Sequence, residues 1–304
     1  MKDNSNPLVS IGIPTYNRVE ALCRAIDCFT NQTYKNIEII ISDNCSPDPK
    51  YLEIAKKNIQ GIKFFRQDKN IGFKKNHDFV KQKARGKYFM WAHDDDVFPP
   101  DYIEISVRHL EADPEAVLVG PKCDRYLDGQ FWYSYDNFSS NGLSTYERLK
   151  QLILDGLISH DRFEQYFNGV FLLSASPLKV SEEFKEQFYL FFALSEKGAI
   201  LHAPELHCIK HTTQEQLDRY NFERNFYAHA GNRHHSILRF FSRNMRECLP
   251  ITLQMMNIII RSKNLTIPEK FKLLARCFYL FCKNTLIAEI MSGIRFIKKK
   301  IHLL

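Results

Sequence analysis

The 304-residue sequence lacks several patterns that mark common classes of nucleotide-using and membrane proteins. Its 12 glycines form neither a Gly-x-Gly pair nor a Gly-x-x-x-x-Gly-Lys run. Dehydrogenases and P-loop NTPases cradle phosphates with such glycines, so both classes are disfavoured. No apolar run reaches roughly 18 residues without a charge, so we expect no bilayer-spanning helix. No internal repeat is visible, which argues against a solenoid or propeller.

Cysteine patterns are also uninformative about metals. The eight cysteines include no Cys-x-x-Cys pair, and no secretory signal opens the sequence. Both absences favour a reducing, cytoplasmic setting in which the thiols are buried. We therefore expect free, buried cysteines.

The composition is that of a folded protein, with 44% hydrophobic and 25% charged residues. The formal charge of +7 is concentrated at the end of the chain, where residues 261–304 hold ten Lys or Arg and two acids. The basic character therefore says nothing about a ligand of the N-terminal part. No nucleic-acid-binding motif accompanies the charge, so a nucleic-acid partner is not expected.

Short β-branched runs alternate with amphipathic segments over the first hundred residues. The expected strands are Leu8–Ile13, Ile37–Ile41, Ile62–Arg66 and Tyr88–Ala92. The expected helices are Val19–Asn31, Tyr51–Asn58 and a segment marked by Phe73, His77, Val80 and Ala84. This alternation predicts an α/β fold with a mostly parallel sheet covered by helices on both faces.

Beyond residue 100 the periodicity is weaker. It predicts a helix that carries Ile103, Val107 and Leu110, a strand at Ala116–Val119, a helix that carries Leu149 to Leu157, and a strand near Ala199–His202. An aromatic cluster at 126–138 follows no period, and is either a platform for a sugar or the apolar core of a long loop. After about residue 215 the chain reads as all-helical.

Polar clusters follow three of the expected strands. They are Pro14–Arg18, Ser42–Ser46 and His93–Asp96. In parallel sheets the carboxyl ends of strands meet at one edge, and ligands bind there where strand order reverses. We therefore expect these three segments to converge on one site.

Asp94, Asp95 and Asp96 form the strongest chemical signal. Adjacent carboxylates repel one another by on the order of 1 kcal/mol per close pair unless a cation offsets them. Hard oxygen ligands suit Mg²⁺ or Mn²⁺, which also take ligands from substrate phosphates. The alternative is a solvated acidic turn that caps the next helix. The apolar strand directly before the triplet favours a metal site over an exposed acidic turn.

These motifs together resemble family 2 glycosyltransferases of the GT-A fold. The resemblance is carried, in the family's order, by Val9–Arg18, Gln32–Tyr34, Glu38–Ser46, Asn70–Gly72 with Asn76, Gly86–Tyr88 and the aspartate triplet. It covers about residues 7–215. It implies an enzyme with a nucleotide-diphosphate sugar donor and says nothing about which sugar.

The resemblance assigns the donor site residue by residue. Pro14, Thr15 and Tyr16 would line the nucleotide pocket with Arg18, Tyr16 would stack on the base, and Asp43 would accept a hydrogen bond from a base such as uracil. An aromatic face beside a carboxylate suits an imide N–H. From the residues alone, Tyr16 could equally be a turn aromatic and Asp43 a turn cap.

Three further residues are assigned to the donor. Lys74 and Lys75 follow Gly72 at an expected helix start, where backbone N–H groups also favour anions, and are assigned to the diphosphate. Asn76 is assigned to the nucleotide sugar. A solvated helix face is the alternative for the two lysines.

The resemblance also assigns metal and catalytic roles. Asp95 would ligate the metal directly, with Asp96 in support, and Asp94 would position the donor. His211 matches the family's late histidine, although Ile209 stands where an arginine is often found. Glu186, with Glu183 and Glu182 behind it, is the expected general base. Gln187 stands where the family usually has an aspartate, and these glutamates could instead be solvated helix acids.

We therefore expect a metal-dependent, inverting sugar transfer to a hydroxyl of a glycan or lipid-linked glycan in surface polysaccharide synthesis. The donor would be a nucleotide-diphosphate sugar, with UDP favoured. The expected domains are 1–215, whose halves 1–100 and 101–215 bind nucleotide and acceptor, and a helical basic extension at 216–304. A nucleotidyltransferase and a non-catalytic nucleotide-sugar or glycan-binding relative are the alternatives.

The extension has the pattern of a membrane-surface helix. Apolar residues fall on one side of an expected helix, namely Phe271, Leu274, Phe278, Phe281 and Cys282. Lysines and arginines are interspersed, which favours peripheral attachment at the inner face of the cell membrane. A helical cap on the catalytic domain or an oligomer contact is the alternative.

Overall fold

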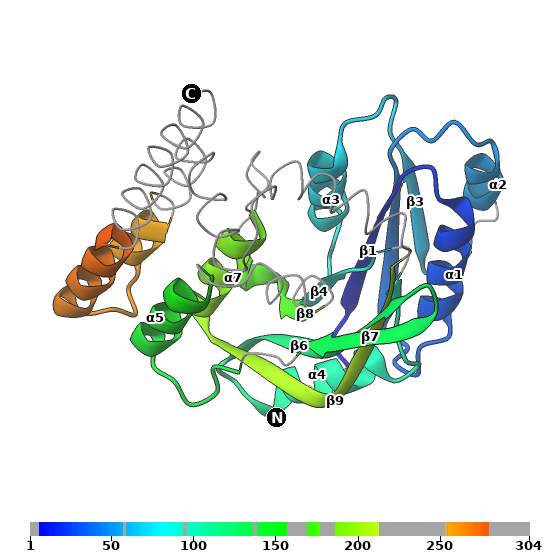
Figure 1. Ribbon diagram of the computed structural model, residues 1–304. Coiled ribbons are helices and arrows are strands. Elements are labelled where there is room, and N and C mark those ends of the chain that lie inside the picture. Colours follow the sequence, from blue (N-terminus) through cyan, green and yellow to red (C-terminus); the bar gives the residue numbers. More distant parts are fainter. Residues whose placement is uncertain are drawn as a thin grey trace, which may run out of the picture. The chain divides into compact units, whose positions relative to one another are not determined.

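The computed structural model describes residues 6–56, 59–93, 96–135, 139–156, 169–176, 186–212, 253 and 255–279. The chain divides into two compact units. One comprises Met1–Leu143 and His160–Thr212, and the other comprises Ser144–Ser159 and Thr213–Leu304. Figure 1 shows the first unit as a sheet with helices packed on it.

Strands and helices alternate in the first hundred residues, as predicted. The elements are β1 (Val9–Thr15), α1 (Val19–Thr30), β2 (Ile37–Asp43), α2 (Lys50–Lys56), β3 (Ile62–Arg66), α3 (Phe73–Gln82) and β4 (Tyr88–Trp91). Each expected strand and helix is present, with ends that differ by a few residues. The β-branched runs form strands because both faces of the sheet are buried.

The rest of the first unit departs more from the sequence pattern. Its elements are β5 (Asp96–Val97), α4 (Tyr102–Ala112), β6 (Ala116–Leu127), β7 (Gln130–Tyr135), β8 (Val170–Leu172), the 3-10 turn η1 (Leu173–Ala175), α7 (Glu186–Lys197) and β9 (Ala199–Thr212). The strands expected to end at 119 and 202 continue to 127 and 212. The short strands β5, β7 and β8 were not predicted.

The aromatic segment from Tyr126 to Tyr135 belongs to a β-hairpin and not to a long loop, which was one of the two alternatives. Residues 136–138 of the cluster lie outside the described residues. Leu127 pairs with Gln130 across a two-residue turn formed by Asp128 and Gly129. Both turn residues have positive φ, +48° and +81°, which matches the turn type that closes tight hairpins.

One sheet contains nine strands in the order β3-β2-β1-β4-β8-β6-β9-β5, with β7 paired to β6. Strands β3, β2, β1 and β4 are mutually parallel. The chain first builds outward from β1 to β3 and then returns to place β4 on the other side of β1. Strand order therefore reverses beside β1, where ligands bind in folds of this kind.

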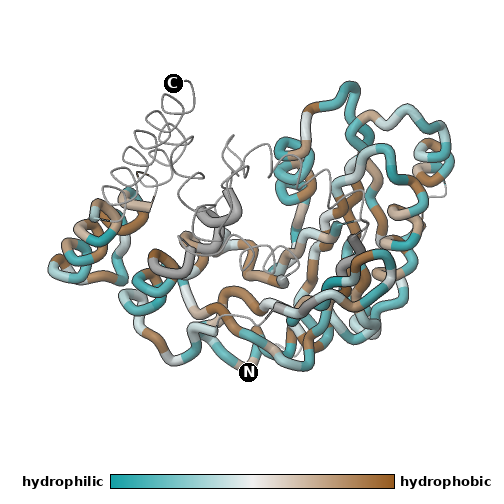
Figure 2. Tube along the Cα trace, in the orientation of Figure 1, coloured by the Kyte–Doolittle hydropathy of each residue, from teal (hydrophilic) through white to brown (hydrophobic). Residues whose placement is uncertain are grey.

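Helices cover both faces of the parallel strands (Figure 1). Ile11 and Ile13 of β1 belong to a buried cluster with Phe29 of α1 and Tyr102 of α4. The intervening Gly12 faces α3, and a Cβ there would lie 2.7 Å from Val80 Cγ2. The central strands are mostly hydrophobic and the loops at their ends mostly hydrophilic (Figure 2). The predicted α/β architecture is confirmed.

Of the six cysteines that the structure describes, only Cys277 is free and buried as expected. Cys123 of β6 and Cys208 of β9 form a disulfide, Cys23 is exposed, and Cys28 and Cys45 are half-buried. The disulfide forms because β6 and β9 pair in parallel with these two residues opposite each other. The partners are 85 residues apart, so no local spacing could indicate the bridge.

The described part of the second unit is helical. It contains α5 (Thr145–Gly156) and helices at 255–261 and 267–279. Thr266 begins the last helix with a capping box, because Glu269 Oε2 accepts bonds from the Thr266 N–H and hydroxyl at 2.8 and 2.7 Å. None of the helices among the described residues is long and apolar enough to cross a bilayer. The expected domain boundaries at 100 and 215 stay a prediction.

Candidate functional site

The carboxyl ends of four parallel strands meet at one edge of the sheet. Thr15 of β1 pairs with Asp43 of β2, which pairs in turn with Arg66 of β3. On the other side of β1, the Ala92 N–H donates to the Gly12 carbonyl at 2.9 Å, directly after β4. The polar segments after these strands therefore converge, as predicted from the sequence.

Asp43 lies at the centre of a buried polar cluster on this edge. One carboxylate oxygen accepts the Ser46 N–H at 2.9 Å, and the other accepts the Arg66 guanidinium. Arg66 also donates to the Ser46 carbonyl at 2.7 Å. Asp43 therefore does cap the turn that follows β2, which was one of the two interpretations. Sequence reasoning missed Arg66, although an arginine that ends an apolar strand at a ligand edge is a usable signal.

The buried side chain of Tyr51 in α2 fixes the position of the loop after β1. Its hydroxyl is buried, accepts the Arg18 N–H at 2.7 Å and lies 3.2 Å from Thr15 Oγ1. The Asn17 N–H, at a residue with φ +54°, donates to Ser46 Oγ at 2.8 Å. Tyr16 is left 46% exposed at the tip of this loop. An aromatic ring on a fixed loop is suited to stacking on a planar base.

Asn76 connects α3 to the end of β2. Its amide donates to the Ser42 carbonyl at 2.9 Å and accepts from Ser42 Oγ at 2.6 Å, and the side chain is buried. This geometry gives Asn76 a positioning role beside Asp43. In the same first turn Lys74 is half-buried and Lys75 is exposed. Their assignment to phosphates stays a prediction.

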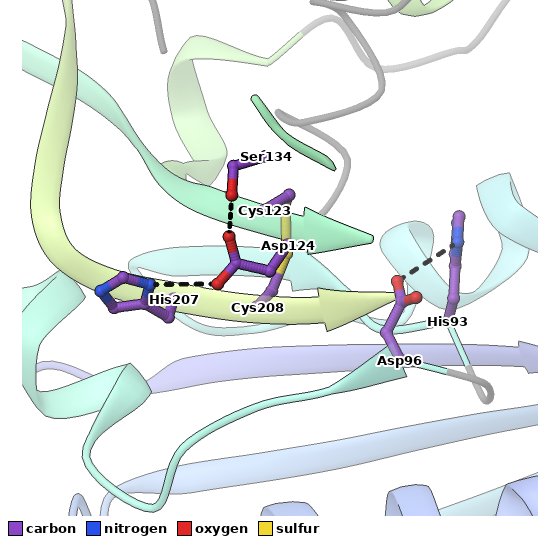
Figure 3. The surroundings of a disulfide bond; sticks show 7 residues. All are labelled: His93, Asp96, Cys123, Asp124, Ser134, His207 and Cys208. Carbon is purple, nitrogen blue, oxygen red and sulfur yellow. Dashed lines mark hydrogen bonds and ion pairs between the residues drawn. A yellow bond between two sulfur atoms is a disulfide. The ribbon is translucent and has the colours of Figure 1, made fainter. Parts of the chain in front are cut away.

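Of the aspartate triplet, Asp94 and Asp95 lie outside the described residues. Asp96 begins β5 and is almost fully buried, with its Oδ2 3.8 Å from His93 Nδ1 (Figure 3). Burial raises the pKa of Tyr102 well above its ordinary value, and the Asp96 carboxylate adds to that rise. Asp96 therefore faces the protein interior, and its supporting role at a metal stays a prediction.

His77 packs behind the same segment. Its Nδ1 lies 3.0 Å from the Phe73 carbonyl, and its ring centroid is 5.8 Å from that of His93. Trp91 of β4 donates its indole N–H to the His77 carbonyl at 3.1 Å. Burial, aided by His93, lowers the pKa of His77 to about 3. The His77 side chain is therefore neutral, and its backbone carbonyl links α3 to the end of β4.

Strand β9 brings a distant segment to the triplet. Asp96 pairs with Lys210, which pairs on its other side with Arg125 of β6. The next pair of the β6–β9 ladder joins Tyr126 and His211. The backbone of His211 is therefore adjacent to the residue opposite Asp96. The His211 side chain lies outside the described residues, and its metal role stays a prediction.

The β6–β7 hairpin carries exposed aromatic rings next to this ladder. Phe131 and Trp132 of β7 are exposed, and the Phe131 ring lies edge-on to Tyr126 at 5.8 Å between centroids. Across the two strands of the hairpin, Asp124 accepts from Ser134, and it lies 3.8 Å from His207 Nδ1 of β9 (Figure 3). Exposed rings on a braced hairpin suit contact with the C–H faces of a sugar.

The expected general base lies at the start of α7. Glu186 is the first residue of that helix, while its side chain and residues 182 and 183 lie outside the described part of the chain. The helix ends at Lys197, and Gly198 turns the chain into β9. A Cβ on Gly198 would overlap the Glu115 carbonyl oxygen, so only glycine fits this approach.

The residues at the edge fit a divalent cation by their chemistry. Asp94, Asp95 and Asp96 supply hard carboxylate oxygens directly after β4, which is the donor set that Mg²⁺ and Mn²⁺ prefer. Among the residues that the structure describes, no three potential ligands form a cluster, and two of the three aspartates fall outside them.

Known proteins share both the sequence pattern and the fold. The putative colanic acid biosynthesis glycosyl transferase WcaA of Escherichia coli strain K12 is 33% identical over 109 residues, which is 35% of this chain and 39% of that protein. The chain thus spans well under half the length of curated relatives that it matches.

Two solved structures have the same architecture at low identity. TarS 1–349 of S. aureus with UDP-GlcNAc has a TM-score of 0.56 and 14% identity, and the match covers 89% of this chain and 71% of TarS. The mannosyltransferase PcManGT from Pyrobaculum calidifontis with GDP-Man and Mn²⁺ has a TM-score of 0.54 and 13% identity, with 99% and 82% covered. These likenesses show the GT-A fold.

Residues 10–167, more than half of the chain, match the family model described as Glycosyl transferase family 2. They include β1 to β4, the loops that join at the ligand edge, and the aspartate triplet. The chain therefore belongs to glycosyl transferase family 2.

Proposed function

We propose that this chain transfers a sugar from a nucleotide-diphosphate donor, with UDP favoured, to a hydroxyl of a glycan or lipid-linked glycan. The observation that carries the proposal is the strand register at the ligand edge. Thr15 pairs with Asp43, and Ala92 bonds to Gly12, so the loop with Tyr16 and the aspartate segment flank the same strand. The loop with Tyr16 would bind the base of the donor, and the neighbouring aspartate segment would bind its diphosphate.

Donor binding begins with the base against Tyr16. A base N–H would bond to the Asp43 carboxylate, which is buried and held in position by Arg66. Asp43 has lone pairs left after binding Ser46 and Arg66, since an ionised carboxylate offers about four acceptor sites. Pro14 and Thr15 at the end of β1 and Arg18 at the start of α1 flank the loop with Tyr16, and the Tyr51 hydroxyl contacts Thr15 and Arg18.

The diphosphate would extend toward Asp94 and Asp95, with Lys74 and Lys75 at the start of α3 as further cationic contacts. A Mn²⁺ or Mg²⁺ ion held by Asp95, with Asp96 and His211 in support, would supply positive charge to the departing diphosphate. PcManGT binds GDP-Man together with Mn²⁺, which supports a divalent ion in this fold. Asp94 would orient the donor sugar.

Transfer would proceed by one displacement with inversion. Glu186 would take the proton from the acceptor hydroxyl, because an inverting reaction needs a base on the face opposite the leaving group. The exposed rings of the β6–β7 hairpin would hold the acceptor, since Tyr126 pairs with His211 beside the partner of Asp96.

The acceptor class follows from a relative's name and not from geometry. WcaA is named for colanic acid biosynthesis, which supports a surface polysaccharide as the product. We place the enzyme on the cytoplasmic side of the membrane, where nucleotide sugars are available to it.

The Asp95→Ala variant tests this function. A panel of UDP- and GDP-sugars is incubated with the protein and Mn²⁺, and release of free nucleoside diphosphate is measured. We expect a loss of at least 100-fold in Asp95→Ala, because charge stabilisation of a leaving group is usually the largest single catalytic contribution. The control is Asp27→Ala, an exposed aspartate on α1, which should match the wild type.

Two other results would contradict the proposal. Pyrophosphate release in place of nucleoside diphosphate would assign a nucleotidyltransferase. Donor binding that depends on Mn²⁺, without turnover on any acceptor, would assign a non-catalytic binding protein.

A further inference from the structure

The helix at 267–279 has two apolar faces, whereas a surface helix of a globular protein usually has one. Leu273 and Cys277 form the buried face. Ile267, Phe271 and Phe278 are 83%, 75% and 59% exposed. Spacings of four and seven residues return to the same side of an α-helix, so these three side chains form one exposed stripe.

Basic residues lie along both edges of the exposed stripe. Lys270 and Lys272 adjoin Phe271 on opposite sides, and Lys272 is exposed. Lys270 Nζ donates to the Ile260 carbonyl at 2.9 Å, which fixes that edge to the end of the preceding helix. Brown and teal positions alternate along this helix in Figure 2.

The only acidic residue between 255 and 279 does not offset this charge along the stripe. Glu269 bonds to Thr266 at the first turn, and the hydrogen bonds from Thr266 lower its pKa. Five basic residues remain in the same segment: Arg261, Lys263, Lys270, Lys272 and Arg276. Lys270 and Lys272 therefore make both edges of the stripe positive, with no acidic residue other than Glu269 in this segment to offset the charge.

This combination identifies the occupant by its chemistry. A second copy of the same surface would bring like charges together, and an uncharged protein partner would leave the lysines uncompensated. An anionic bilayer accepts aromatic and aliphatic side chains below its headgroups and attracts lysines at the headgroup level. We infer that the helix at 267–279 docks the protein on an anionic lipid surface through Ile267, Phe271 and Phe278.

The docking surface is separate from the chemistry of sugar transfer and can be tested without nucleotide. Full-length protein is sedimented with vesicles of phosphatidylcholine alone and with vesicles that contain 30% phosphatidylglycerol. We expect binding to the anionic vesicles only, and weaker binding as salt is raised. The Phe271→Ser, Phe278→Ser double variant should bind at least tenfold more weakly.

Two matched variants make the test specific. Lys272→Gln should lower anionic-vesicle binding roughly fivefold, the effect of one basic side chain near such a surface. Leu52→Ser removes another exposed apolar residue, 44% exposed on α2 in the other unit, and should leave binding unchanged. Melting temperatures of all variants establish that each is folded.

Three outcomes would overturn the inference. One is equal vesicle binding by the folded double variant, and another is equal wild-type binding to neutral and anionic vesicles. The third is a wild-type dimer that the double variant converts to a monomer in light scattering, which would assign the stripe to self-association. Because no donor is present, none of these results depends on whether the chain transfers sugar.

Discussion

Asp43 is a buried carboxylate whose position depends on two partners from other segments. Ser46 and Arg66 satisfy its oxygens, and Arg66 is itself only partly exposed. Removing one member of such a pair leaves a charge buried without compensation, which is costly. The same contacts fix the turn after β2 and one wall of the proposed base slot, so stability and donor binding are coupled at this residue.

Replacing Arg66 by Met tests that coupling. We expect Arg66→Met to lose about 2 kcal/mol in the free energy of unfolding, because Asp43 keeps only the Ser46 N–H. UDP affinity should fall at least tenfold, measured by calorimetry. Arg24→Met, at an exposed arginine on α1, is the control. Unchanged stability and unchanged UDP affinity together would refute the role of the pair.

His77 predicts how stability depends on pH. Its pKa is about 3 in the folded protein and near 6.5 when unfolded, so between these values the unfolded state binds the extra proton. Stability from this residue is therefore present above pH 6.5 and lost as pH falls, by about 1.4 kcal/mol per unit. Urea unfolding at pH 7 and 5 should show about 2 kcal/mol less pH dependence in His77→Gln. Equal pH dependence in both proteins would contradict this account.

The sequence indicated some residues of the site and not others, for a physical reason. Tyr16, Asp43 and the triplet stand in local motifs, so the sequence alone indicates them, and their roles stay predictions. Arg66 and Tyr51 act on partners 23 to 36 residues away, through contacts that exist only after β1, β2 and β3 pair in register. The disulfide of Cys123 and Cys208 is the extreme case, since it depends on the β6–β9 ladder.

At the scale of elements, the strands that could be predicted are those rich in apolar residues. Strands β1, β2 and β4 are almost fully buried and β3 is half-buried, whereas β7 mixes Gln, Ser and aromatic residues and reads as a loop. Strand β5 has two residues and exists only because Asp96 and Val97 pair with β9. Neither strand shows the alternation or the apolar run by which a strand is recognised in a sequence.

The junction of α7 and β9 gives a prediction about an element. Gly198→Ala should lower the melting temperature by several degrees, because the added Cβ would overlap the backbone of Glu115 and push β9 away from β6. Glu115→Ala changes the exposed side chain of the same neighbour and should melt like the wild type. A Gly198→Ala variant as stable as the wild type would show that the backbones at Gly198 and Glu115 leave room for a Cβ.

At the scale of the whole chain, the order of motifs was enough to predict the fold and the family. The strand sequence β1 to β4, with polar loops at the carboxyl ends, has the arrangement at which open α/β sheets bind their ligands. The sequence could not predict the sugar or the acceptor, because the segments that we propose to contact them, the β6–β7 hairpin and β9, come together only in the folded sheet.

The central claim is that one sheet edge binds the base and the diphosphate of the donor. A crystal structure of the protein with UDP and Mn²⁺ tests it most directly. We predict that the uracil ring stacks on Tyr16 within hydrogen-bonding distance of Asp43 or Arg66, and that the diphosphate lies against residues 94–96. A nucleotide bound away from the ends of β1 and β2 would contradict the account.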